Sequence, residues 1–311
     1  MNYRLKTMRN INILDFLFSL KGKIGTFGWM GNKDIFISGD HYIKSFDEAT
    51  VGTITFKYFK KEPEDKIVTD VLDSAASVVI VDKRLLSLFT YSGLNPFGLL
   101  IFVENVKLSI VKFLHQVTEI ITPSYSDKSE FKNCFIGPGV YIEKGVKIGE
   151  NVTLVGNIYI YENTVIGNNV VVKPGVVIGG QGFGFERDTD GILIHFPHIG
   201  GVIIEDNVMI GSCTCIDKGT FGNTLLKKGC VIDNLVHIAH NVEVGENALV
   251  VANSATGGHV KIEEEAYIGL STTILPGKII GKKSLTGASS CVVKDVKENS
   301  TVMGVPAKPK E

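Results

Sequence analysis

Two histidines, His237 and His240, lie three residues apart in the stretch DNLVHIAHNVEVG, within a chain that has seven histidines in 311 residues. A neutral imidazole accepts a proton near neutral pH, because its unperturbed pKa is about 6.5. One such side chain therefore suits general base catalysis. Imidazole is also a common metal ligand, so a metal site is the alternative. The spacing alone leaves both kinds of site open.

The residues around this pair repeat with a period of six. A helix repeats every 3.6 residues and a strand every two, so a period of six predicts neither an isolated helix nor a plain sheet. Short β segments joined by tight glycine and asparagine corners, with one inward aliphatic residue each, predict stacked coils of a solenoid. The first row of aliphatic residues is Ile136, Ile142, Ile148, Leu154, Ile160, Ile166, Val172 and Ile178. A later row contains Ile238, so His237 and His240 are expected on either side of an inward residue, near the outer surface.

The periodic part is preceded by a segment with a different pattern. Residues 1–122 predict a small α/β domain, with a strand in ATVGTITFKYF, a buried strand at Val78 to Val81 and an amphipathic helix from about Val106 to Val117. Residues 123–134 are polar and form a predicted linker. The β-helical domain is expected over 135–298, with a projecting loop at 182–201 and a small register slip at 217–226. Residues 299–311 are a predicted tail.

Composition excludes some classes of partner. The 32 basic and 33 acidic residues give a net charge of −1, which does not favour nucleic acid binding. No uncharged apolar run reaches the roughly 18 residues that span a membrane, and the start of the chain lacks a signal-peptide cleavage site. Five cysteines at no metal-like spacing indicate reduced thiols and a cytoplasmic protein.

Several longer motifs carry a family resemblance. GGQGFGFE, IHFPHIGGVIIEDNVMIGSCTCIDKGT and IDNLVHIAHNVEVG resemble the UDP-3-O-acylglucosamine N-acyltransferase family of hexapeptide-repeat proteins. That resemblance implies a left-handed parallel β-helix with coils of 18 residues, preceded by a small α/β domain. It also implies a homotrimer with active sites between subunits.

The expected activity follows from the same resemblance. It is transfer of an acyl group from a thioester to the amino group of a nucleotide-linked amino sugar, with no permanently bound cofactor. The C-terminal GASSCVVKDVKENSTVMGVPAKPK resembles sugar acetyltransferases that use acyl-coenzyme A. Acyl-coenzyme A is therefore the favoured donor, and an acylated acyl carrier protein is the alternative.

The resemblance assigns roles around the histidine pair. His240 matches the family's general base, and Asp233 is expected to orient it. The family's second functional histidine falls at Gly277 in this chain, so that imidazole is missing. His237 is a candidate for contacting the sugar or phosphate of the acceptor, with a structural role as the alternative.

The 18-residue coil places Gly258 beside His240, since stacked coils lie about 4.8 Å apart. We expect that glycine to leave room for a thioester or acyl chain. Its backbone N–H is a candidate donor to the oxyanion. His259, at the edge of the same space, is a candidate substrate contact.

Aromatic residues supply the remaining candidates. Gly182, Phe183 and Phe185 are expected either to line an acyl or pantetheine channel or simply to cap an interrupted coil. Phe56 matches an aromatic residue on which the family stacks uracil. The alternative interpretation is that Phe56 is simply a buried residue of a strand. The second aromatic, expected near Glu62, is absent, so Tyr58 or Phe59 would have to replace it.

Four other functions remain open from the sequence. The HIAHN and GGHV motifs also resemble UDP-N-acetylglucosamine O-acyltransferases, which transfer to a hydroxyl group. The chain could also be the lipid A N-acyltransferase proper. A γ-type carbonic anhydrase would use His237, His240 and His259 as zinc ligands. A scaffold that has lost catalysis is the non-enzymatic alternative.

Overall fold

A computed structural model describes residues 3–6, 8–12, 14–15, 18, 27–31, 36–39, 43–44, 47, 49–51, 53–57, 64–89 and 98–309. The chain forms two compact units. One comprises Tyr3–Ile121 with Gly184–Pro197, and the other comprises Thr122–Phe183 with His198–Glu311. The chain therefore leaves the second unit after Phe183 and returns to it at His198. No helix in the described part of the chain is long and apolar enough to cross a membrane.

The first unit is built on a four-stranded sheet in the order β3-β7-β6-β5. Strands β5, β6 and β7 run parallel, whereas β3 pairs antiparallel with β7. The parallel strands are apolar along their length and buried, as strands covered on both faces are. The predicted buried strand and amphipathic helix are both present, as β6 and α4. The elements are β3 (Phe27–Gly31), β5 (Ile54–Phe56), α3 (Glu64–Leu72), β6 (Val78–Asp82), η2 (Lys83–Leu88), β7 (Leu99–Val103) and α4 (Val106–Val117).

Short antiparallel pairs complete the described part of this unit. They are β1 (Tyr3–Leu5) with β8 (Thr118–Ile120), β2 (Met8–Asn12) with β4 (Phe36–Gly39), and β17 (Phe185–Arg187) with β18 (Leu193–His195).

The segment 182–201, predicted as a loop, contains the β17–β18 hairpin. Its turn is closed by Asp188, whose Oδ1 accepts hydrogen bonds from the backbone N–H groups of Asp190 and Ile192. An aspartate that bonds to the backbone two residues on is a strong turn former, so the DTDG sequence makes a hairpin where an irregular loop was expected. The hairpin is fixed within the first unit by a Lys107–Glu186 ion pair.

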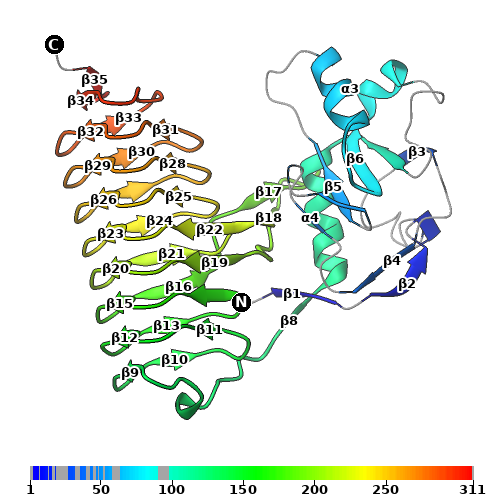
Figure 1. Cartoon of the computed structure of the whole chain (residues 1–311). Coiled ribbons are helices and arrows are strands. Elements are labelled where there is room, and N and C mark those ends of the chain that lie inside the picture. Colours follow the sequence, from blue (N-terminus) through cyan, green and yellow to red (C-terminus); the bar gives the residue numbers. More distant parts are fainter. Residues whose placement is uncertain are drawn as a thin grey trace. The chain divides into compact units, whose positions relative to one another are not determined.

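The second unit is a parallel β-helix with three faces (Figure 1). Strands of successive coils stack into three sheets. The eight-stranded sheet is β10 (Tyr141–Ile142), β13 (Tyr159–Ile160), β16 (Val177–Gly180), β21 (Cys215–Asp217), β24 (His237–Ile238), β27 (Ala255–Thr256), β30 (Thr273–Ile274) and β33 (Cys291–Val292). The seven-stranded sheet is β11 (Lys147–Ile148), β14 (Thr164–Ile166), β19 (Gly201–Ile204), β22 (Asn223–Leu226), β25 (Glu243–Val244), β28 (Lys261–Ile262) and β31 (Ile279–Ile280).

The third sheet has ten strands and includes the C-terminal end of the described chain. It consists of β9 (Phe135–Ile136), β12 (Thr153–Leu154), β15 (Val171–Val172), β20 (Met209–Ile210), β23 (Val231–Ile232), β26 (Leu249–Val250), β29 (Tyr267–Ile268), β32 (Leu285–Thr286), β34 (Thr301–Met303) and β35 (Lys308–Pro309). A 3-10 turn, η4 (Lys128–Glu130), precedes the first coil.

Strand register gives the length of each coil. Thr153 pairs with Phe135 on one side and with Val171 on the other, so a regular coil takes 18 residues. Val171 then pairs with Met209, because the chain makes the 182–201 excursion between them. Met209 pairs with Val231, which gives a coil four residues longer than the regular one. The register of the coils is therefore interrupted twice, once by the 182–201 excursion and once between Met209 and Val231.

The aliphatic rows form the core of the β-helix. Leu154, Ile160, Val172 and Ile178 are fully buried, and Ile238 is 0% exposed. Between coils, corner asparagines with positive φ recur at the same position, and Asn169 both accepts from Asn151 and donates to Asn207. Asparagine tolerates the left-handed conformation better than most residues, which explains its repetition at these corners.

Candidate active site

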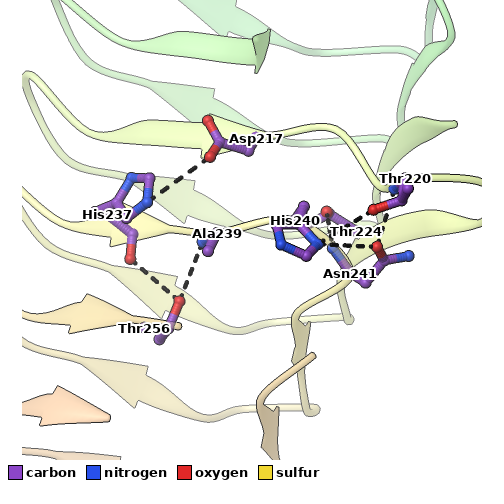
Figure 2. A network of polar contacts seen from close by, with 8 residues as sticks. All are labelled: Asp217, Thr220, Thr224, His237, Ala239, His240, Asn241 and Thr256. Carbon is purple, nitrogen blue, oxygen red and sulfur yellow. Dashed lines mark hydrogen bonds and ion pairs between the residues drawn. The ribbon is translucent and has the colours of Figure 1, made fainter. Parts of the chain in front are cut away.

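The central histidines lie on β24 and on the corner that follows it (Figure 2). Ile238 is buried in the core, whereas the side chain of His237 is 46% exposed and His240 is half-buried. The predicted placement of the two imidazoles on either side of an inward isoleucine is thus confirmed. Chemistry that uses them takes place on the outside of the β-helix.

The Nδ1 atom of His240 lies 3.2 Å from Oδ1 of Asn241 and 3.3 Å from Oγ1 of Thr220 (Figure 2). The backbone N–H of Thr220 donates to the same Asn241 Oδ1 at 2.9 Å, so that amide atom is the oxygen. An amide oxygen only accepts hydrogen bonds, so Nδ1 of His240 carries the proton. The lone pair is then on Nε2, which is the nitrogen able to act as a base.

Burial lowers the pKa of His240 below its usual value, and the hydrogen bond with Asn241 opposes part of that decrease. The neutral imidazole is therefore favoured at neutral pH. A base must be unprotonated before it can accept a proton, so this shift suits general base catalysis.

Gly258 lies against the ring of His240, as the 18-residue coil predicts. A β-carbon at this position would lie 2.5 Å from Cε1 of His240 and closer still to Nε2. The space left by the missing side chain is therefore filled by the imidazole itself, and the expectation that it would hold a thioester or acyl chain is wrong. The glycine lets the base sit directly on the neighbouring coil.

Two further imidazoles surround His240. The ring of His198 lies 5.0 Å from it, centroid to centroid, at an interplanar angle of 69°, and the ring of His259 lies 5.2 Å away at 88°. His198 is 1% exposed, whereas His259 is exposed. His198 lies in the interrupted coil, where the repeat does not predict neighbours, so its contact with His240 could not be foreseen from the sequence.

His237 faces a different partner. Its Nε2 lies 3.7 Å from Oδ2 of Asp217 on the adjacent strand β21 (Figure 2). Burial raises the pKa of Asp217 to about 7, and burial together with the proximity of His240 lowers the pKa of His237. Opposite charges at this distance attract each other, which favours the charged form of both side chains. The distance is too long for a hydrogen bond, however, and burial, which disfavours both charges, outweighs that attraction.

Asp233 has partners other than the predicted one. Its Oδ1 accepts from the backbone and side-chain nitrogens of Asn234, and its Oδ2 accepts from the backbone N–H of Ala252 at 3.2 Å. The contacts of His240 Nδ1 are with Thr220 and Asn241 instead. The predicted contact between Asp233 and His240 is therefore not formed, and Thr220 and Asn241 contact Nδ1 in its place. The carboxylate of Asp233 binds nearby N–H groups at the corner instead.

The position of the family's second histidine is open here. A β-carbon at Gly277 would have no atom within 4 Å, and its φ of +68° continues a corner row that includes His259 at +60° and Asn241 at +58°. The left-handed conformation of His259 is therefore a property of this corner of the coil.

The candidate aromatic residues divide between the two units. Phe183 is 87% exposed in the second unit, whereas Phe185 lies in the first unit with its ring 5.2 Å from that of His195. Gly182 packs against His198 and His240, since a β-carbon there would lie 2.8 Å from Nε2 of His198 and 3.0 Å from Cβ of His240.

Phe56 ends strand β5 and is partly buried. Tyr58 and Phe59, expected to complete the uracil site, lie outside the described residues. The nucleotide role of this domain therefore stays a prediction.

The zinc alternative requires three side chains that converge on one point. Among the residues that the structure describes, no three His, Cys, Asp or Glu side chains lie so as to hold a metal ion. His237 instead faces Asp217, while His259 contacts the ring of His240. The three histidines of the carbonic anhydrase alternative therefore do not converge on one point within a single chain.

Comparison with known proteins agrees with this geometry. Residues 132–162 match the model of a family described as "Hexapeptide repeat of succinyl-transferase". A UDP-3-O-acylglucosamine N-acyltransferase of Methylococcus capsulatus is 35% identical over 136 residues, which is 44% of this chain and 38% of the relative. One called UDP-3-O-acylglucosamine N-acyltransferase 2, of Legionella pneumophila, is 41% identical over 136 residues, or 43% and 39% of the two chains. The match thus spans about two fifths of the length of these relatives.

A crystal structure of the UDP-N-acetylglucosamine acyltransferase of Francisella novicida superposes with a TM-score of 0.53 at 26% identity. The superposition covers 58% of this chain and 64% of that one. It supports the predicted fold class, a left-handed parallel β-helix preceded by a small α/β region. In sequence and fold, the chain resembles the hexapeptide-repeat acyltransferases of UDP-sugars, and the N-acyltransferases among them in particular.

Proposed function

We propose that the protein transfers an acyl group from a thioester donor to the amino group of a nucleotide-linked amino sugar, with His240 as general base. The observation that carries this proposal is the surroundings of the His240 ring. Its Nδ1 lies 3.2 Å from an oxygen of Asn241 that can only accept a hydrogen bond, which favours a proton on Nδ1 and a lone pair on Nε2, and burial lowers the pKa of the ring. The similarity to N-acyltransferases supports the choice of an amine as acceptor.

The reaction needs one proton transfer at the acceptor. The amine nitrogen attacks the thioester carbonyl carbon while Nε2 of His240 takes a proton from that nitrogen. The C–N bond forms, the C–S bond breaks, and the proton passes from the imidazolium to the leaving thiolate. The backbone N–H of Gly258, next to the base, is the proposed donor to the oxyanion in the tetrahedral intermediate.

Acyl-coenzyme A is the favoured donor, on the resemblance of the C-terminal segment to acetyltransferases that use it, and an acylated carrier protein is the alternative. Purified protein is to be assayed with acetyl-coenzyme A and with 3-hydroxyacyl carrier protein as separate donors. Acylation of a UDP-amino sugar by either donor supports the proposed reaction. A scaffold without activity would turn over neither.

The pH dependence of turnover reports the state of the base. Since the pKa of His240 is lowered, a larger fraction of the ring is neutral at any given pH, and the acidic limb of kcat/KM moves to lower pH. We expect the midpoint of that limb below about 6.5, the usual value for histidine. The profile is measured from pH 5 to 8 in the Asp217→Asn background, so that the Asp217 carboxyl, whose pKa is about 7, does not contribute to the limb. The separately determined titration of the acceptor amine is divided out. A midpoint above the usual histidine value contradicts the proposed base.

Asp217 and His237 are the proposed contacts to the acceptor. The ammonium form of an amino sugar can bind the Asp217 carboxylate and loses its extra proton to solvent before the neutral amine attacks, whereas a hydroxyl acceptor brings no charge. Asp217→Asn is therefore expected to lower kcat/KM for an amine acceptor about 10- to 100-fold, the range of a hydrogen bond to a charged group. Transfer to a hydroxyl acceptor should change little.

Steady-state rates with UDP-glucosamine and UDP-N-acetylglucosamine measure that difference. Glu246→Gln, an exposed corner residue, is the matched control. Equal losses for both acceptors would remove Asp217 as the amine contact. Efficient transfer to UDP-N-acetylglucosamine by the wild type would favour the O-acyltransferase alternative.

The proposed assembly is a homotrimer. On the ten-stranded sheet, outward side chains of consecutive coils form an apolar row in strict register: Met209, Val231, Leu249, Tyr267 and Leu285. Met209, Leu249, Tyr267 and Leu285 are each 38–40% exposed. A long apolar row on the surface of one chain is typical of a protein interface. This row is the surface that self-association would bury.

Leu249→Glu places a charge in the middle of that row. We expect the variant to elute as a monomer of 33.8 kDa and the wild type as a trimer, measured by light scattering coupled to size-exclusion chromatography. Lys147→Glu, at an exposed position of the seven-stranded sheet, is the control and should remain a trimer. A monomeric wild type or a trimeric Leu249→Glu would contradict this interface.

A further inference from the structure

We infer that Gln181 and His198 form a clamp that positions the ring of His240, and that this clamp is built from the two ends of the 182–201 excursion. The inference rests on the proposed function, in which His240 is the base. It concerns positioning residues, because neither side chain is placed in contact with substrate.

The first observation is a pair of hydrogen bonds that closes the excursion. Gln181 donates through Nε2 to the carbonyl oxygen of His198 at 3.0 Å, and its Oε1 accepts from the backbone N–H of His198 at 2.8 Å. One amide side chain thus satisfies both backbone groups of His198. The chain leaves the second unit after Phe183 and returns at His198, so this pair fixes the point of return.

The second observation is how the chain continues after His198. The backbone N–H groups of Ile199 and Gly200 donate to the carbonyl oxygens of Thr220 and Gly219, at 2.9 and 3.1 Å. Thr220 also contacts Nδ1 of His240 through its hydroxyl group. The returning segment is therefore bonded to the residue that helps to hold the base.

The third observation is close packing at Gly182. A β-carbon at Gly182 would lie 2.8 Å from Nε2 of His198 and 3.0 Å from Cβ of His240, so the three residues are in contact. His198 is 1% exposed, and its ring meets that of His240 at 69°. An aromatic edge contact of this kind restricts rotation of the half-buried His240 ring. Nε2 is thereby kept in one direction.

These contacts also exist if the clamp serves only to anchor the hairpin, so the test needs a readout at His240 itself. In protein labelled with ¹⁵N-histidine, long-range ¹H–¹⁵N spectra give the tautomer of each imidazole. The wild type should show the Nδ1–H tautomer at His240, assigned with His240→Gln. His198→Ala and Gln181→Ala should shift that signal towards a mixture of tautomers or add a second one.

Turnover gives the second readout. A displacement of about 1 Å costs about 10²-fold in rate, so His198→Ala is expected to lower kcat by about 10- to 100-fold with KM for acceptor and donor little changed. His198→Phe keeps an aromatic edge at the same place and should restore most of kcat. Asp190→Ala, at the exposed turn of the hairpin, is the control and should match the wild type in both readouts.

The outcomes separate the two proposals. A changed His240 signal in a protein with no acyltransferase activity would retain the clamp and remove the proposed function. Unchanged His240 signals and an unchanged kcat in folded His198→Ala would overturn the clamp. If His198→Ala fails to fold, the clamp is tested by the His240 signal and kcat of Gln181→Ala and His198→Phe instead. A loss of kcat in His198→Phe equal to that in Gln181→Ala, with a wild-type His240 signal in both, would also overturn it.

Discussion

Replacing His240 with alanine is expected to lower kcat by about 10²- to 10⁴-fold, the usual contribution of a general base. The loss arises because the variant lacks Nε2, the nitrogen proposed to take the proton from the acceptor amine. Since His240 is half-buried and lies outside the aliphatic core, the melting temperature should fall only slightly. Single-turnover rates with saturating donor and acceptor measure the effect on the chemical step.

Two companion variants make that result specific. His240→Gln keeps a side chain of similar polarity and should be as inactive as His240→Ala, because an amide is not a base. Glu246→Ala, an exposed residue at a neighbouring corner, should turn over like the wild type. If His240→Ala retained activity within about tenfold of the wild type, a loss far below that expected of a base, another residue would have to take the proton.

Gly258→Ala is expected to lower kcat by about 10²-fold, because a β-carbon there displaces the ring of His240. The backbone at Gly258 is not in the left-handed region, so alanine is tolerated by the main chain and the collision is with the imidazole. Its backbone N–H, the proposed oxyanion donor, remains in place. The same single-turnover assay measures the loss.

A double-mutant cycle shows whether the effect passes through the base. In the His240→Ala background there is no ring to displace, so Gly258→Ala should cost little further activity, and the two effects should be strongly non-additive. Gly28→Ala is the matched control, since a β-carbon there meets no atom within 4 Å. Additive losses would mean that Gly258 acts independently of His240.

The regular part of the β-helix was predictable because its signal is local. A residue at one position of a six-residue repeat has the same environment as its counterpart in the next hexad. The inward direction of Ile238, the outward directions of His237 and His240, and the contact of His240 with Gly258 all follow from counting. In the first unit, the apolar run of β6 and the amphipathic pattern of α4 were sufficient for the same reason.

The contacts that complete the site could not be counted in this way. His198 reaches His240 after the excursion, and Thr220 and Asp217 lie in the coil that is four residues longer than a regular one. Where the six-residue period is interrupted, the residues that become neighbours depend on the path by which the chain re-enters the β-helix. Asp233 was assigned to His240 by the family resemblance, whereas in the structure its carboxylate accepts hydrogen bonds from the backbone N–H groups of Asn234 and Ala252.

Gly277 occupies the position at which the resemblance implies a second histidine, but other histidines lie beside His240 in the structure. The sequence has one imidazole where the family resemblance implies two. In the structure, His198 and His259 both lie beside His240, within 5.0–5.2 Å between ring centroids. The imidazoles around the base therefore come from other positions in the chain than the one that the resemblance indicates.

The most direct test of the proposed reaction is mass spectrometry of the products formed from UDP-glucosamine and a thioester donor by the wild type and by His240→Ala. Acetyl-coenzyme A and 3-hydroxyacyl carrier protein are each supplied as donor. The proposed function predicts an amide at the sugar nitrogen with the wild type, and none above background with the variant. An amide formed equally well by both proteins, or acylation confined to a hydroxyl group, would contradict N-acyl transfer with His240 as base.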